Sequence, residues 1–159
     1  MPRAIPRRST DPSPSAQLRT FFAKYTRATE AAARKVLARL RRLTPGATEL
    51  VYDNYNGLVV GFGPSERASD AVLSMFVARD HVSICFLQDG PDLPDPAGIL
   101  RGSGNVVRHV RLESPADLES PAILTLIATA LKRADVRIDP KARRRLVIRS
   151  ISKKQRPRR

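Results

Sequence analysis

Tryptophan is absent from this chain of 159 residues, and cysteine occurs only once, as Cys85. A single cysteine excludes a disulfide within the chain and is typical of proteins from a reducing compartment. No apolar run approaches the roughly 18 residues that a membrane-spanning helix needs. Residues 1–6 also lack the apolar segment of a secretory signal peptide. We therefore expect a cytoplasmic protein with no membrane partner.

Recognisable catalytic and metal-binding motifs are also missing from the sequence. It contains neither the Gly-x-Ser-x-Gly motif of serine hydrolases nor the His-Glu-x-x-His motif of zinc enzymes. The only imidazole and thiol groups belong to His81, His109 and Cys85. None of them is paired at the short spacing typical of zinc sites. We therefore expect no catalytic residue, no metal site and no cofactor.

Positive charge dominates the composition, with a formal net charge of +14, and it is concentrated at the two ends of the chain. Residues 132–159 carry 13 Lys/Arg against two Asp, and residues 1–10 carry three Arg. Residues 11–131 carry 13 basic and 13 acidic side chains and are neutral. Within that neutral part, residues 15–43 hold eight basic residues and only one acidic residue, Glu30.

Periodicity and turn residues predict an α+β domain at residues 15–133. Residues 1–14 are rich in Pro, Ser and Arg, which favours a flexible basic arm. An apolar stripe at helical spacing predicts a helix over residues 15–43, and a second over residues 114–133 or 117–133. Asn56-Gly57 predicts a hairpin turn. The expected strands are residues 49–55, 58–62, 71–78, 82–87 and 106–112. The prediction is a two-layer fold: a helix, about five antiparallel strands, and a helix.

The C-terminal segment, residues 134–159, is expected to be a disordered basic tail. Its few apolar residues, Leu146 to Ile148 and Ile151, could instead form an edge strand or fold only on a partner. Dense arginine and lysine attract phosphate backbones, which predicts weak, sequence-independent binding of nucleic acid. The alternative is a tail that only improves solubility. The predicted nucleic-acid contacts are Arg143, Arg144, Arg145, Arg149, Lys153, Lys154 and Arg156.

A small-ligand pocket is a second candidate site. The first hairpin is unusually polar, and its tyrosines, amide and carboxylate suit a small polar ligand or a nucleobase. The Gly102 turn could form a nest of backbone N–H groups for an anion, or simply a tight turn that needs a glycine. The candidate ligand residues are Tyr52, Asp53, Tyr55, Asn56, Arg67, Gly102, Ser103, Gly104 and Arg108.

From Phe21 to about Arg133 the chain resembles the YdhG-like family, small bacterial domains of largely unknown function grouped with frataxin-like iron chaperones. The resembling stretches are ELVYDNYNGLVVGFGPSERASDAVLSMFV (49–77), FLQDGPDLPDPAGILRGSGNVVRHVRL (86–112) and LESPAILTLIATAL (118–131). The resemblance implies an α-β-α layered domain and, for a few members, iron delivery. The strongly basic first helix departs from the acidic first helix that is typical of iron chaperones. Because cations repel Fe²⁺, this departure argues against iron binding.

Three functional hypotheses follow from the sequence. The leading one is a non-enzymatic binding domain whose basic tail binds nucleic acid. The second is an iron chaperone, from the resemblance alone. The third is a small-ligand-binding or enzymatic domain with a pocket near Tyr52 and Asp53.

Overall fold

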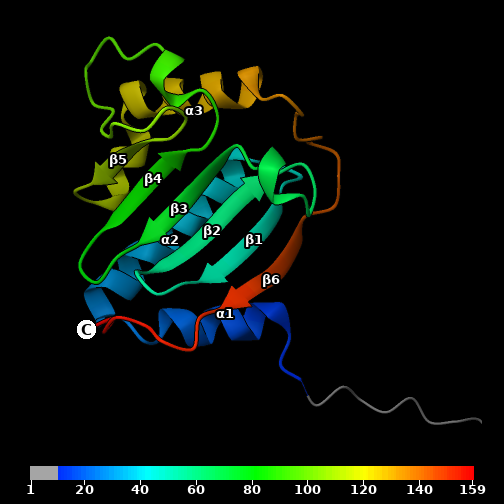
Figure 1. The fold of residues 1–159 in the computed structure, drawn as a ribbon, viewed down its shortest axis with the longest axis vertical. Helices are drawn as coiled ribbons and strands as arrows, with labels where there is room; N and C mark the ends of the chain where they lie inside the picture. Colours follow the sequence, from blue (N-terminus) through cyan, green and yellow to red (C-terminus); the bar gives the residue numbers. More distant parts are fainter. Residues whose placement is uncertain (1–10) are drawn as a thin grey trace, which may run out of the picture.

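The computed structural model describes residues 11–159, so most of the expected N-terminal arm (residues 1–10) lies outside the described residues. The described chain forms a single six-stranded sheet with three α-helices (Figure 1). The elements in chain order are α1 (Pro14–Phe22), α2 (Arg27–Leu43), β1 (Thr48–Asp53), β2 (Leu58–Gly63), the 3₁₀ turn η1 (Ala68–Asp70), β3 (Leu73–Val77), β4 (Val82–Phe86), η2 (Gly90–Asp92), β5 (Arg108–Leu112), η3 (Pro115–Glu119), α3 (Pro121–Arg133) and β6 (Arg145–Ile151).

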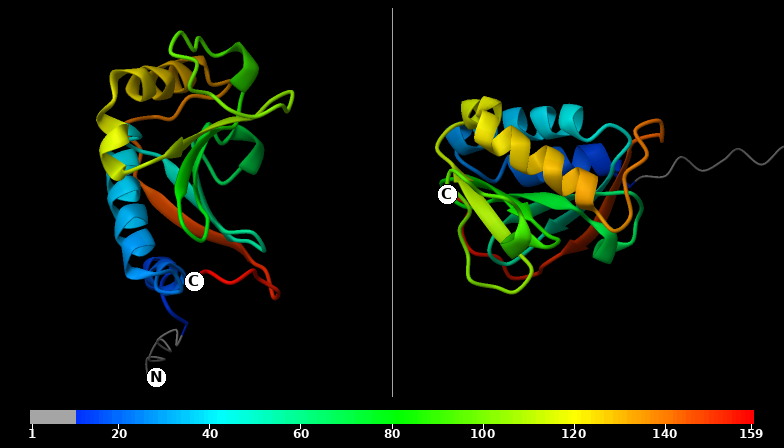
Figure 2. Two further views of the ribbon diagram at one scale, coloured as in Figure 1. Left: turned by 90° about the vertical axis from the view of Figure 1, so that its left-hand side faces the viewer. Right: turned by 90° about the horizontal axis from the view of Figure 1, so that it is seen from above.

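The architecture has two layers, as the sequence predicted. The strands lie in the order β5-β4-β3-β2-β1-β6, and neighbours are antiparallel except for the parallel pair β1 and β6. Figure 2 shows the three helices on one side of the sheet. The α+β class is therefore confirmed, with six strands instead of about five and one parallel pair that was not expected.

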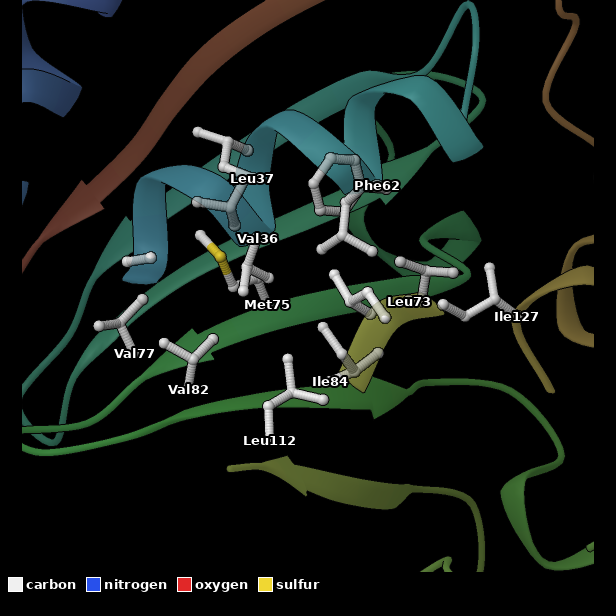
Figure 3. Close-up of a cluster of buried hydrophobic side chains, with 14 of the residues drawn as sticks. Val36, Leu37, Phe62, Leu73, Met75, Val77, Val82, Ile84, Leu112 and Ile127 are labelled. Atoms are coloured by element: carbon white, nitrogen blue, oxygen red, sulfur yellow. The ribbon is translucent and has the colours of Figure 1, made fainter. Parts of the chain in front are cut away.

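The hydrophobic core lies between the sheet and the helices (Figure 3). Val36 and Leu37 of α2 face Phe62, Met75 and Ile84 of the sheet. These three strand residues point to the same side of the sheet, because the side chains of a strand alternate between its two faces. All five side chains are at most 5% exposed. Burial of such side chains contributes roughly 1.5–3 kcal/mol each, so this interface accounts for much of the stability of the fold.

The first predicted helix is in fact two helices. Thr26 adopts an extended conformation and caps α2, with its hydroxyl accepting a hydrogen bond from the Thr29 amide. Immediately before it, Tyr25 is 1% exposed, and its hydroxyl donates to the Val77 carbonyl at 2.8 Å and accepts from the Leu58 amide at 3.1 Å. The prediction of one helix over residues 15–43 was wrong because this long-range contact holds the chain where the helix would have continued.

The turn between β1 and β2 spans four residues, not the predicted two. Asp53 pairs with Leu58, and the Asn54 amide donates to the Gly57 carbonyl at 3.0 Å. A Cβ atom on Gly57 would lie 2.4 Å from the Val77 carbonyl oxygen and 2.7 Å from the Phe76 ring. Glycine is therefore required here for space, because the end of β3 packs directly against the turn.

The second predicted helix starts later than expected. Residues 115–119 form η3, and α3 begins at Pro121. The Asp117 carboxylate accepts hydrogen bonds from the Glu113 and Ser114 amides, at 2.7 and 3.3 Å. These hydrogen bonds around Ser114 cap the short 3₁₀ turn η3, and the helix itself begins only after it.

The C-terminal segment is folded, so the prediction of a disordered tail was wrong. Residues 145–151 form β6, which pairs in parallel with β1 at the edge of the sheet. Leu146 and Ile148 pack against the core. Of the two alternatives that the sequence left open, the edge strand is the one observed. The physical reason lies in two buried carboxylates of β1, which receive arginine partners from this segment.

Candidate functional site

Glu49 of β1 is fully buried and is neutralised by two arginines. The Arg41 guanidinium donates to both carboxylate oxygens, with distances of 2.8–3.2 Å. Arg144 donates to the same carboxylate at 2.8 Å and also to the Arg41 and Thr44 carbonyls. Arg144 therefore links the end of α2 to the strand β1. Its guanidinium donates to three partners within the protein, and its side chain is half-buried, so Arg144 differs from the exposed cations among the predicted nucleic-acid contacts.

Asp53, a predicted ligand residue, is also buried and serves the fold. Its carboxylate receives the Lys24 ammonium at 2.7 Å and the Arg158 guanidinium at 3.0 Å, and its backbone carbonyl accepts from Gln155. Burial raises the pKa of the Asp53 carboxyl, but the hydrogen bonds from Lys24, Gln155 and Arg158 outweigh burial and hold that pKa below its ordinary value. Asp53 thus fixes the C-terminal residues beside α1.

A sequence signal for these two clusters did exist. Glu49, Val51 and Asp53 alternate along one strand, so the two carboxylates share the apolar, helix-covered face with Val51. Buried carboxylates require cationic or hydrogen-bonding partners. The spacing could therefore have predicted that cations from elsewhere in the chain reach β1, although it could not have identified which ones.

Tyr55 and Asn56 lie in the exposed turn after β1. The Arg156 guanidinium lies over the Tyr55 ring, 5.4 Å from its centroid, and the Tyr55 carbonyl accepts hydrogen bonds from the Arg156 amide and the Arg158 side chain. The turn thus supports the C-terminal segment. Tyr52, in contrast, lies on the opposite face of β1 from Asp53.

The Gly102 turn and Arg108 lie far from the first hairpin. β5 is four strands away from β1, which is about 19 Å at the usual strand spacing. Gly102 has φ +118°, which favours glycine and supports the tight-turn interpretation. The Arg108 guanidinium donates to the Gly104 and Val107 carbonyls. Ser103, in the same turn as Gly102, is exposed. Arg67 lies in the loop before η1, and its guanidinium donates a hydrogen bond to the Ser69 hydroxyl. The predicted ligand residues therefore do not converge on one pocket.

The face of the sheet opposite the helices is partly open. Figure 1 views the sheet from this side, with α2 behind the strands. The loop containing η1 covers one end: Ala71 Cα lies 3.0 Å from the position that a Cβ of Gly63 would take. The other end forms a patch of half-buried or exposed side chains. We call this patch the helix-free face; it consists of Tyr52, Val59, Phe76, Cys85, His109 and Arg111.

The C-terminal segment presents a row of exposed cations. Arg145 pairs with Glu66, and Arg144 and Arg158 are occupied as described. The other basic residues on or beside β6 are exposed, and in residues 11–159 none of them forms an ion pair with an acidic side chain. We call this set the basic edge; it consists of Arg143, Arg149, Lys153, Lys154 and Arg156.

The cysteine and histidines are scattered. Cys85 lies on β4, where burial raises the pKa of its thiol above the ordinary value. His81 bonds the Asp80 carboxylate at 2.8 Å, which lowers the pKa of Asp80, and His109 lies on β5. No group of three or more His, Cys, Asp and Glu side chains in residues 11–159 is arranged to hold a metal ion.

No helix in residues 11–159 is both long and apolar enough to span a membrane.

Comparison with known proteins identifies no relative. No family model matches the chain, and neither a curated protein nor a solved structure matches it. The resemblance to the YdhG-like family therefore remains a prediction from the quoted sequence stretches.

Proposed function

We propose that this protein is a non-enzymatic binding domain whose basic edge binds the phosphate backbone of nucleic acid weakly and without sequence preference. The observation that supports the proposal is the basic edge itself: five exposed cations that have no acidic partner within residues 11–159, one of them on β6 and the others in the segments directly before and after it. The pairing of β6 with β1 and the ion pairs of Arg144 and Arg158 order the backbone around these cations, so less conformational entropy is lost on binding than with a flexible tail.

Such an interface makes binding strongly dependent on salt. Each phosphate that a cation neutralises releases condensed counterions, with a slope of about −0.7 per contact for single strands. Five contacts give a slope of about −3.5, so affinity falls roughly 100-fold between about 50 and 200 mM salt. Arginine, which contributes three of the five cations, can donate two hydrogen bonds to one phosphate.

Deletion of the C-terminal segment is a poor test, because it removes β6 and the partners of Glu49 and Asp53. Substitution of the five basic-edge residues by glutamine removes the charge and keeps the fold. A matched control replaces five exposed basic residues outside this edge, likewise without ion pairs among the described residues: Arg27, Lys35, Arg42, Arg79 and Lys132. Both variants lose the same net charge.

Fluorescence anisotropy with a labelled oligonucleotide at several salt concentrations compares the three proteins. We expect the basic-edge variant to lose most of the affinity and most of the salt slope, and the control variant to keep both. An equal loss in the two variants would show that only the overall charge matters. No binding by the wild-type protein at low salt would refute the proposed function.

A further inference from the structure

The helix-free face carries two aromatic rings in one row across the sheet. Strand register pairs Tyr52 with Val59 and Val59 with Phe76. The two rings are therefore two strands apart, about 10 Å at the usual spacing, on the same face. Both residues are half-buried, so neither is fully covered by the rest of the chain. The Phe76 ring lies against Gly57, where a larger residue would displace it.

The same row ends in positive charge on both sides. Beyond Phe76 the register continues through Ser83 to Arg111, which is exposed on the border strand β5. Beyond Tyr52 it reaches Ser150 of β6, next to Arg149, which is exposed in the bulge of that strand and belongs to the basic edge. A chain crossing the row would meet a cation, two rings and a second cation.

No strand position on the helix-free side of the sheet in residues 48–151 is occupied by an acidic residue. The two carboxylates of β1, Glu49 and Asp53, point to the helix-covered side, where they are buried. The strand positions on the helix-free side in residues 48–151 are apolar, small, aromatic or basic. A contiguous patch of partly exposed apolar side chains is a feature of interaction surfaces, and the cations at the two ends of this row favour an anionic partner.

We propose that the helix-free face binds single-stranded nucleic acid, with bases stacked on Tyr52 and Phe76 and the backbone held by Arg111 and the basic edge. The inference rests on the proposed function and specifies its substrate. Aromatic rings on an open sheet bind unpaired bases in single strands. A duplex keeps its base faces stacked inside, so it would contact only the cations. The protein therefore prefers single strands to duplexes of the same sequence.

Ring substitutions separate stacking from charge. Loss of one stacking platform weakens binding about 5- to 150-fold, which corresponds to the usual stacking contribution. We expect Tyr52→Leu and Phe76→Leu each to weaken binding of a labelled oligouridylate within that range and to leave the salt slope unchanged. Tyr52→Phe and Phe76→Tyr keep a ring and retain affinity. Val59→Ala, between the two rings, is the matched control for lost apolar area, and circular dichroism verifies that every variant folds.

Cross-linking locates the bases directly. Irradiation of the full chain with an oligonucleotide containing 5-bromouridine, followed by mass spectrometry, should place adducts on the peptides with Tyr52 or Phe76. Adducts confined to the basic edge, equal affinity for single strands and duplexes, or ring variants with wild-type affinity would overturn this inference while leaving the proposed function intact. Absence of any salt-dependent binding by the wild type would overturn both.

Discussion

Substitution of Arg158 tests whether the C-terminal segment is a structural part of the domain. Its side chain is 4% exposed, and its guanidinium donates to the Asp53 carboxylate at 3.0 Å and to the Tyr55 carbonyl at 3.2 Å. Breaking a buried ion pair by removing one partner costs about 3–5 kcal/mol. Asp53 keeps Lys24 as a partner, so we expect Arg158→Met to lower the free energy of unfolding by about 3 kcal/mol, the low end of that range.

Thermal unfolding measures this loss. For a domain of this size, each kcal/mol lowers Tm by about 2–4 °C, so the expected decrease is about 6–12 °C. Lys154→Ala is the matched control, because Lys154 is an exposed cation in the same segment, and it should change stability by less than about 0.5 kcal/mol. In an Asp53→Asn background the effect of Arg158→Met should shrink, with a coupling of about 1–3 kcal/mol.

The pH dependence gives an independent test. The pKa of Asp53 is lower in the folded protein than in the unfolded chain. Its ion pairs therefore stabilise the fold above the unfolded pKa of about 3.9, and this contribution is lost as pH falls through the lower folded pKa. The stability difference between wild type and Arg158→Met should thus be full at neutral pH and decrease in acid. If Arg158→Met is no less stable than Lys154→Ala at neutral pH, the proposed structural role of the tail is refuted.

Two further predictions concern the close contacts at the ends of β2 and β3. Gly57→Ala places a Cβ atom 2.4 Å from the Val77 carbonyl oxygen, so we expect the free energy of unfolding, measured in urea, to fall by about 1–3 kcal/mol. Wild-type stability of this variant would show that the turn can move away. Tyr25→Phe leaves the buried Val77 carbonyl and Leu58 amide without their hydroxyl partner and should cost about 1–3 kcal/mol, whereas a cost near zero would mean that water replaces the hydroxyl.

Local signals in the sequence predicted the two-layer α+β class and the approximate position of most elements. The predicted strands 58–62, 71–78 and 82–87 correspond to β2, β3 and β4, in which every second residue is apolar and covers the core. The glycine of the Asn56-Gly57 pair lies in the turn as expected, although it is needed for space instead of for a two-residue turn. The positive φ of Gly102 was anticipated by its residue type.

Contacts between distant residues were not predictable in this way. Tyr25 interrupts the first helix through hydrogen bonds to Leu58 and Val77, which lie 33 and 52 residues away. Among the candidate site residues, Tyr52 and Asp53 are adjacent in sequence but lie on opposite faces of the sheet. The candidate ligand residues of the first hairpin and of the Gly102 turn do not lie in one pocket, because the strand order places β5 and β1 four positions apart.

The sequence by itself determined the charge of the chain, the helical and strand periodicities, and the basic character of its C-terminal residues. Only the tertiary structure decided what those basic residues do. Burial of Glu49 and Asp53 behind the helices demands cationic partners, and this demand draws Arg144 and Arg158 inside while Arg149 and Lys153 remain exposed. All four are similar cations in one basic segment, and what distinguishes them is the desolvation of carboxylates roughly a hundred residues away in the chain.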